Sequence, residues 1–271
     1  MTENQANNHE FLTDIQERLN GNNIIAIASG KGGVGKTTLA VTLAHAFSKQ
    51  GLKVLLFDGD LGLSNIDIHL GITPNENLET VIKMNDPLNL AITHESTLQC
   101  DIITGHSGDQ SLSNLNGPQL KLLADDLLIL SSYYDKVIID LGSGIYENLI
   151  HLANCAKTCL VLITNTPTSL TDAYQFIRLL INQDPAKNIK LIMNMVDTLA
   201  EGEQTYQTFL TALEAFLHVK PQLGGIIHYD STVKKSLQEQ TSLLSFNLNT
   251  PASQDILKIS QSLINHEIIH P

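Results

Sequence analysis

The chain has 271 residues, of which 42 % are hydrophobic and 16 % are charged, and its formal net charge is -12. That composition is typical of a globular protein that is long enough to bury a sizeable core. The negative balance, which no cluster of Lys and Arg offsets, repels polyanions, so we expect no non-specific binding of nucleic acid by the surface as a whole.

The cysteines and the apolar runs indicate the compartment. Cys100, Cys155 and Cys159 are too few for a disulfide framework, and the Cys-x-x-x-Cys spacing of the last two does not match a metal site. No signal peptide precedes the first predicted strand, and no apolar run approaches the roughly 18 residues of a membrane span. We therefore expect a cytoplasmic protein in a reducing environment.

Two regions differ in pattern. Residues 1–22 are rich in Asn, Gln and Glu, which predicts a flexible leader that carries a short amphipathic segment at 11–19. Residues 23–271 alternate short apolar runs with helical patterns and contain no linker or repeat, so we expect one domain. The apolar runs lie at 24–28, 54–57, 101–104, 137–139, 159–164, 189–193 and 223–228. The helical patterns lie at 39–49, 119–131, 145–153, 169–181, 203–217 and 231–240, with a closing helix at 250–266.

The alternation predicts an α/β fold. Because the apolar runs lack polar residues at every second position, both faces of each strand should be covered. We therefore expect a mostly parallel twisted sheet with helices on both faces. In such a sheet the ligand binds at the carboxyl ends of the strands. That rule brings five polar segments to one edge of the sheet: 30–37, 58–65, 140–144, 165–171 and 194–197.

The segment between the first predicted strand and the first predicted helix matches Gly-x-x-x-x-Gly-Lys-Thr, the phosphate-binding P-loop. Its glycines let the backbone approach an anion, and the helix N-terminus attracts a phosphate. Lys36 should reach the β- and γ-phosphates of ATP, and the Thr37 hydroxyl should ligate Mg²⁺. A chance glycine turn is the structural alternative. The predicted nucleotide-binding residues here are Gly30, Lys31, Gly32, Gly33, Val34, Gly35, Lys36, Thr37 and Thr38.

Three aspartates follow predicted strands. Asp140 ends an apolar run in the Walker B pattern, and we expect it to hold Mg²⁺ directly or through water. Asp58 and Asp60 end the second predicted strand at i and i+2, so both side chains should lie on one side. One of them would position the attacking water and the other would support the metal shell. The alternative is that they only stabilise a turn with Gly59 and Gly62.

The loop carries a second lysine, Lys31, in Lys-Gly-Gly-Val-Gly-Lys-Thr. This spelling resembles the deviant Walker A loop of the MinD/ParA/nitrogenase-iron-protein class of ATPases. Residues 58–71, Asp-Gly-Asp-Leu-Gly-Leu-Ser-Asn-Ile-Asp-Ile-His-Leu-Gly, resemble the switch segment of the MinD branch. Together with Pro-Thr-Ser-Leu-Thr-Asp-Ala-Tyr at 167–174, they are most similar to the flagellar-number regulators of the FlhG/FleN type. The resemblance covers nearly the whole chain.

The resemblance implies an ATP-bound homodimer whose nucleotides are sandwiched at the interface and whose hydrolysis releases monomers. By position, Lys31 would act on the partner's nucleotide, Lys36 would be the P-loop lysine, and Asp60 would serve the attacking water. Thr37 and Asp140 would serve magnesium. Asn194 would hydrogen-bond the adenine, with an ordinary loop asparagine as the alternative. The implied partners are the signal-recognition-type GTPase FlhF and flagellar switch or transcription-factor proteins.

The sequence departs from the family in three places. Asn165 and Thr166 stand where an acidic pair is frequent, and Ile227-His228 replaces a usual Ile-Pro, which affects the contacts expected beside the purine. The N-terminal motif that is thought to stimulate the partner GTPase is only echoed, at 14–19.

The amphipathic last helix has one lysine, Lys258, so we expect it to dock on the domain; transient binding to the inner membrane face or the cell pole is the alternative.

Three functions compete. The first is an ATPase switch that limits flagellar assembly, with slow, partner-stimulated turnover. The second is a ParA-like DNA-partition or other positioning ATPase, which the acidic charge disfavours. The third is a nucleotide-binding scaffold without turnover.

Overall fold

The computed structural model describes residues 21–74, 76, 78–105 and 115–265. The strands are β1 (Ile24–Ser29), β2 (Val54–Gly59), β3 (Thr93–Glu95), β4 (Cys100–Ile103), β5 (Lys136–Ser143), β6 (Thr158–Ile163), β7 (Asn188–Val196) and β8 (Gln222–His228). The helices are α2 (Lys36–Ser48), α3 (Ile66–Leu70), α4 (Leu78–Met84), η1 (Leu88–Ala91), α5 (Gly117–Ser131), α6 (Glu147–Cys155), α7 (Pro167–Gln183), α8 (Leu199–Leu217), α9 (Thr232–Gln238), α10 (Leu243–Phe246) and α11 (Pro251–Asn265).

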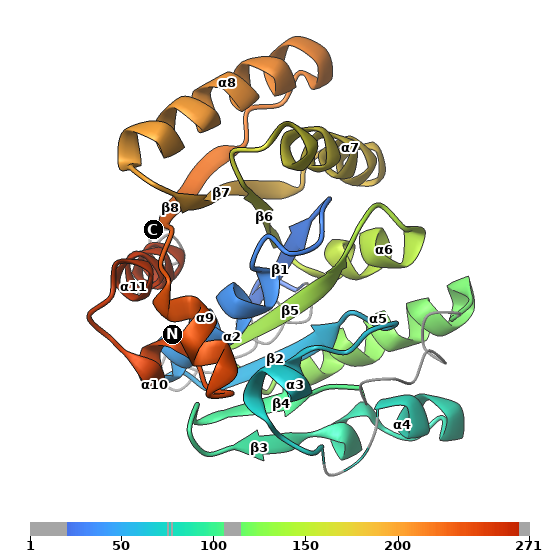
Figure 1. Ribbon diagram of the computed structural model, residues 1–271. Coiled ribbons are helices and arrows are strands. Elements are labelled where there is room, and N and C mark those ends of the chain that lie inside the picture. Colours follow the sequence, from blue (N-terminus) through green and yellow to red (C-terminus); the bar gives the residue numbers. More distant parts are fainter. Residues whose placement is uncertain (1–20, 75, 77, 106–114, 266–271) are drawn as a thin grey trace, which may run out of the picture.

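The strands form one sheet in the order β3-β4-β2-β5-β1-β6-β7-β8 (Figure 1). All neighbouring strands pair in parallel except β3 and β4, which pair antiparallel at one edge. β1 lies between β5 and β6, with β2 on one side of that group and β7 on the other. The loop after β1 therefore opens at the centre of the sheet, where the order of the strands reverses and ligands bind in such folds. The expected α/β fold with a mostly parallel sheet is confirmed.

Two hydrophobic clusters cover the two faces of the sheet. Alternate residues of β1 belong to different clusters: Ile24 and Ala26 face one, whereas Ile25 and Ile27 face the other. The first cluster is completed by α5, α6, α7 and α8, and the second by α2, α10 and α11 (Figure 1). This alternation explains why the strand sequences read as continuous apolar runs.

Several elements differ from the sequence expectation. The helix expected at 145–153 begins at Glu147, because β5 continues to Ser143. The helix expected at 169–181 begins at Pro167, where the Thr166 side chain accepts a hydrogen bond from the Ser169 N–H. The short elements β3, α3, α4, η1 and α10 were not expected from the sequence.

The last helix packs on the domain. The apolar side chains Ile256, Ile259 and Leu263 of α11 are buried, and α11 contacts α2 and β8. The apolar face that the sequence offered to a membrane is therefore occupied within the chain. None of the helices in the described part of the chain is long and apolar enough to cross a bilayer. The amphipathic segment at 11–19 and the echoed motif at 14–19 lie outside the described residues.

Candidate functional site

The P-loop connects β1 to α2 and is shaped by glycines. Gly33 and Gly35 have φ angles of 76° and 94°, in the left-handed region that side chains other than glycine disfavour. A Cβ on Gly35 would also lie 2.7 Å from Asn194 Nδ2. The backbone N–H groups at the start of α2 have no side-chain cap, because the residue before the helix is a glycine. The loop therefore leaves the helix N-terminus open to an anion.

Asn194 braces this loop from the neighbouring half of the sheet. It lies near the end of β7, is buried, and donates from Nδ2 to the Val34 carbonyl oxygen at 2.7 Å. Sequence reasoning assigned Asn194 to the adenine base. Its amide nitrogen supports the P-loop in the structure, and its contact with a base stays a prediction.

Lys36 and Asp140 lie at the base of the loop. Lys36 Nζ donates to Ser29 Oγ at 3.0 Å. Burial lowers the pKa of this lysine, whereas the negative charges of Asp140 and Asp60 raise it by a smaller amount. Asp140 is fully buried on β5, and burial, followed by the charge of Asp58, raises its pKa to about 8. Both shifts show that the fold disfavours the charged forms of these groups.

The Asp140 carboxyl fits a cation site. The Thr37 side chain hydrogen-bonds to this carboxyl, and Asp140 Oδ1 has no hydrogen-bond partner among the described residues. A buried, unpaired carboxylate oxygen beside a hydroxyl is a ligand set that Mg²⁺ prefers, and a cation would remove the unfavourable burial of its charge. Thr37 and Asp140 are thus brought together as the sequence predicted, and their binding of metal stays a prediction.

Asp58 is engaged in a different way. It is buried at the end of β2, and burial raises its pKa to about 6. Its Oδ2 accepts hydrogen bonds from Ser64 Oγ at 2.8 Å, Asn65 N at 3.0 Å and Ile66 N at 3.1 Å, and its Oδ1 accepts one from Asp60 N at 3.1 Å. These contacts favour the turn-stabilising alternative for Asp58. The contact between Asp58 and the nucleotide or its metal is untested by the geometry.

Asp60 lines a cavity that begins at the P-loop and is described below. Burial raises the pKa of its carboxyl, whereas the Leu63 N–H and the Lys36 charge lower it. The carboxyl accepts hydrogen bonds from Leu63 N at 3.2 Å and from Asn65 Nδ2 at 3.4 Å. The turn that Asp58 organises therefore also positions Asp60, whose side chain lies beside Gly142 near the end of β5.

Lys31 and Lys36 have different hydrogen-bond partners. Lys31 Nζ donates to Thr168 Oγ1 at 2.7 Å, at the start of α7. The same part of the loop packs tightly on that helix, because a Cβ on Gly30 would lie 2.2 Å from the Asp172 backbone. In this single chain, the second lysine is therefore held outside the cavity that Lys36 lines.

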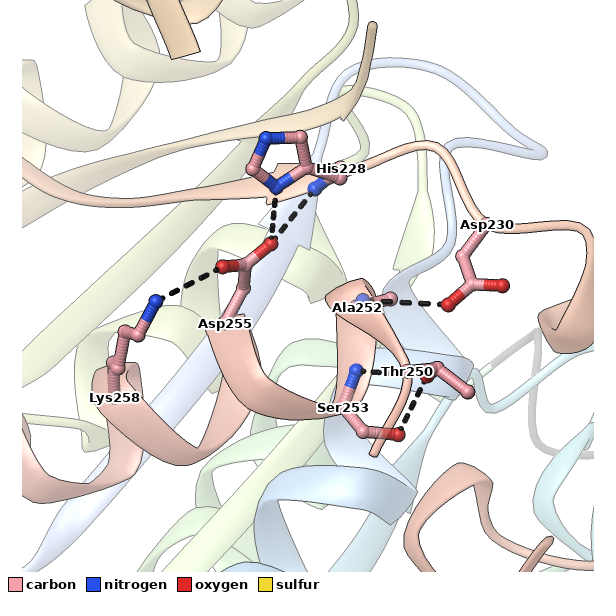
Figure 2. A network of polar contacts seen from close by, with 7 residues as sticks. All are labelled: His228, Asp230, Thr250, Ala252, Ser253, Asp255 and Lys258. Atoms are coloured by element: carbon pink, nitrogen blue, oxygen red, sulfur yellow. Dashed lines mark hydrogen bonds and ion pairs between the residues drawn. The ribbon is translucent and has the colours of Figure 1, made fainter. Parts of the chain in front are cut away.

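A cavity of about 630 Å³ extends from the P-loop toward the C-terminal helices. Of the residues predicted from the sequence, it is lined by Gly32, Gly33, Gly35, Lys36, Thr37, Thr38, Asp60 and Asn194. Its far end is lined by residues 227–231, 233, 234 and 237 and by Ala252 and Ile256 of α11, which sequence reasoning did not assign to the site. Figure 2 labels three of these residues, His228, Asp230 and Ala252. The unusual Ile227-His228 pair was the one signal that pointed there.

Comparison of the chain with known protein families and sequences identifies its family. Residues 25–243 match the CobQ/CobB/MinD/ParA nucleotide binding domain. The antiactivator FleN of Pseudomonas aeruginosa is 32 % identical over 241 residues, which cover 89 % of this chain and 85 % of that protein. The flagellum site-determining protein YlxH of Helicobacter pylori is 31 % identical over 270 residues, which cover 97 % and 90 %.

Solved structures show the same fold. The septum site-determining protein MinD of Pyrococcus horikoshii, complexed with Mg-ADP, has a TM-score of 0.76 at 21 % identity and covers 91 % of this chain and 97 % of its own. At this identity the likeness shows the fold alone. The chain belongs to the CobQ/CobB/MinD/ParA family of nucleotide-binding domains, and within it to the MinD/ParA class with the deviant Walker A loop.

Proposed function

We propose that this protein is an ATP-dependent, dimerising ATPase switch that regulates the number or placement of flagella. The observation that carries the proposal is that the two lysines of the P-loop have different partners. Lys36 Nζ donates to Ser29 and is affected by the charge of Asp140, whereas Lys31 Nζ donates to Thr168 on α7. The flagellar role is supported by the similarity over most of the chain to FleN and YlxH. We expect the protein to act in the cytoplasm.

The chain's own residues divide the chemistry among them. Lys36 and the open N-terminus of α2 would neutralise the phosphates, and Thr37 with Asp140 would hold Mg²⁺, which neutralises charge on the transferring group. Asp60 would accept a hydrogen bond from the attacking water and orient it. Phosphoryl transfer depends mostly on such positioning and charge neutralisation, so one well-placed carboxylate is sufficient as an orienter.

The homodimer would form at the edge of the sheet where the site opens. Large apolar side chains are exposed in the segments around that edge: Leu63, Ile68, Ile145, Tyr146, Met195 and Tyr229. Exposed apolar side chains of this size are typical of a surface that another protein covers. ATP would favour the dimer because each nucleotide would be contacted from both copies, and hydrolysis would remove that preference. FlhF and flagellar switch or transcription-factor proteins are the partners we expect.

Two variants and a matched control test the proposal. Lys36→Ala should abolish ATP binding in titration calorimetry. Asp60→Ala should bind ATP normally and release phosphate roughly 10² to 10⁴ times more slowly, because it loses only a positioning group. Lys49→Ala, an exposed lysine at the other end of α2, should behave as the wild type.

Flagellar counts in the source organism then test the role. Replacing the gene with the Lys36→Ala or Asp60→Ala version should change the number or position of flagella, and the Lys49→Ala version should not. Unchanged flagella in both site variants would contradict the flagellar role. Retention on random duplex DNA with ATP and magnesium, lost with added salt, would favour a DNA-partition ATPase instead. Wild-type protein that binds ATP and releases no phosphate with any candidate partner would favour a scaffold without turnover.

A further inference from the structure

The outer face of α5 carries a stripe of exposed apolar side chains. Leu122, Ile129 and Tyr133 are 48 %, 56 % and 66 % exposed. With Asp126 they follow one another at i, i+4, i+7 and i+11, the spacing that places residues on one face of a helix. Tyr133 lies just past the end of α5 and continues its last turn, because its N–H donates to the Leu130 carbonyl oxygen at 3.1 Å. Exposed apolar side chains aligned in this way are typical of a surface that another segment covers.

The described chain begins beside this helix. A Cβ on Gly21 would lie 3.3 Å from Leu128 Cδ2 of α5. Asn23 Nδ2 donates to the carbonyl oxygens of Ser131 and Tyr134, at 2.8 Å and 2.9 Å. These contacts fix the start of the domain at the carboxyl end of α5, where the apolar stripe finishes. The residues that precede Gly21 therefore join the domain next to the stripe.

The sequence before Gly21 contains a segment of matching character. Its apolar residues Phe11, Leu12, Ile15 and Leu19 fall at i, i+1, i+4 and i+8. Leu19 is two residues from Gly21, a stretch of chain that spans about 7 Å when extended. Residues 11–19, the leader segment, are therefore within reach of α5.

Charge favours the leader segment over a second copy as the occupant of the stripe. Burial and the neighbouring charge of Asp125 raise the pKa of Asp126, so a positive charge beside this carboxyl would be stabilising. Arg18 is the one arginine or lysine among residues 1–20. A second copy seated on the same stripe about a two-fold axis would instead bring acidic side chains against acidic side chains.

We propose that the leader segment of the same chain docks on the outer face of α5, with its apolar side chains on Leu122, Ile129 and Tyr133 and with Arg18 beside Asp126. Nine helical residues span about 13 Å, and the stripe from Leu122 to Tyr133 spans about 16 Å. A short tether gives the segment an effective concentration on the order of millimolar, so contacts that would not hold a free peptide are sufficient. A partner that recognises the leader segment must first displace it from α5.

Trypsin cleavage after Arg18 measures the docking in the full-length chain. Arg18 is the one tryptic site before Lys31. A docked segment is cut only while it is away from α5, so the cleavage rate reports the undocked fraction. Mass spectrometry follows the release of residues 1–18 from the nucleotide-free wild type and the cleavage of a synthetic peptide of residues 8–25. The wild type should be cut at least about tenfold more slowly than the peptide, as expected when one large apolar side chain is buried.

Two variants change the two sides of the contact. Ile129→Ser and Phe11→Ser should each raise the cleavage rate about tenfold, to that of the peptide. The double variant should be cut no faster than either single one, because both remove the same interaction. Phe216→Ser, which removes an exposed aromatic side chain from α8 at the far end of the sheet, is the control and should keep the wild-type rate (Figure 1). Thermal unfolding shows whether Ile129→Ser folds, and Phe11→Ser leaves the domain unchanged.

Three results would overturn the proposal. The first is a wild type that is cut as fast as the peptide. The second is a cleavage rate that Phe11→Ser or a folded Ile129→Ser does not change. The third is a nucleotide-free wild-type dimer, seen by sedimentation velocity, that Ile129→Ser dissociates and Phe11→Ser does not, because a second copy then covers the stripe. The proposed binding and hydrolysis of ATP would stand in all three cases.

Discussion

At the scale of single residues, the site holds its charged groups where folding disfavours their charge. Burial lowers the pKa of Lys36 and raises that of Asp140 to about 8. Asp140 Oδ1 has no hydrogen-bond partner in the described part of the chain, which adds a further cost to burying this carboxylate. Binding a cation and a polyanion should stabilise such a site more than a site whose polar groups are already hydrogen-bonded, because the ligands supply the missing charges and hydrogen bonds.

The stability of the ligand-free protein should therefore depend on Asp140. Its carboxyl titrates near pH 8 in the folded state and near about 3.9 in an unfolded chain. Between these values the folded state binds more protons, so its stability falls as pH rises. Asp140→Asn, which cannot ionise, should raise the melting temperature without nucleotide by several degrees at pH 8 and by less than half as much at pH 5.

Differential scanning calorimetry at the two pH values measures both shifts. Asp86→Asn, which changes an exposed acid, is the control and should change neither melting temperature. A melting temperature that falls at pH 8 in Asp140→Asn would mean that folding stabilises the carboxylate, which would contradict an unfavourable burial of its charge.

At the scale of elements, Asp58 organises the segment that carries Asp60. Asp58 lies near the end of β2 and accepts hydrogen bonds from the backbone N–H groups of Asn65 and Ile66. Thr104, which follows β4, donates to the same carboxylate from Oγ1 at 3.2 Å. The short helix α3 begins at this point. One carboxylate therefore ties two parallel strands to the turn that holds the predicted water-orienting group, so the geometry of Asp60 depends on Asp58.

Asp58→Asn should loosen this turn. The amide offers one acceptor oxygen in place of two, and losing hydrogen bonds to buried groups costs about 1–3 kcal/mol. We expect slower ATP hydrolysis with near-normal ATP binding, and faster hydrogen exchange at the amides of Asn65 and Ile66. Thr104→Val removes one of the contacts without touching the cavity and should shift the same amides less. Unchanged exchange together with weaker binding of Mg²⁺ or ATP would instead assign Asp58 to the nucleotide.

The same elements show what the sequence could predict. The strands β1, β2, β4, β5, β6, β7 and β8 follow from apolar runs, and the P-loop follows from a motif of adjacent residues. The short elements α3 and β3, of five and three residues, are too short to show a periodic pattern. α3 begins at Ile66, whose backbone N–H donates to the Asp58 carboxylate. The far end of the cavity depends on contacts between distant residues, such as His228 with Asp255, which no local pattern encodes.

At the scale of the whole molecule, the second lysine of the P-loop does not line the cavity of its own chain. Lys31 is hydrogen-bonded to Thr168 on α7, 137 positions along the chain, whereas Lys36 is the lysine of the P-loop that lines the cavity. The contact joins two partly exposed side chains by a single hydrogen bond, which is easily exchanged for a stronger one with a phosphate. In the proposed dimer, Lys31 would therefore be able to leave α7 for the nucleotide of the second copy.

If Lys31 acts on the partner's nucleotide, Lys31→Ala should bind ATP as a monomer and fail to dimerise, and its turnover should fall. An arginine that neutralises the transferring phosphoryl group from a partner gives roughly 10³ to 10⁵ in rate. A lysine lacks the two-pronged geometry of the guanidinium, so we expect a smaller loss. Sedimentation velocity with a non-hydrolysable ATP analogue measures the dimer directly. Thr168→Val, which removes only the resting contact of Lys31, should dimerise at least as well as the wild type. A normal dimer of Lys31→Ala would show that this lysine is a surface charge beside the phosphate site.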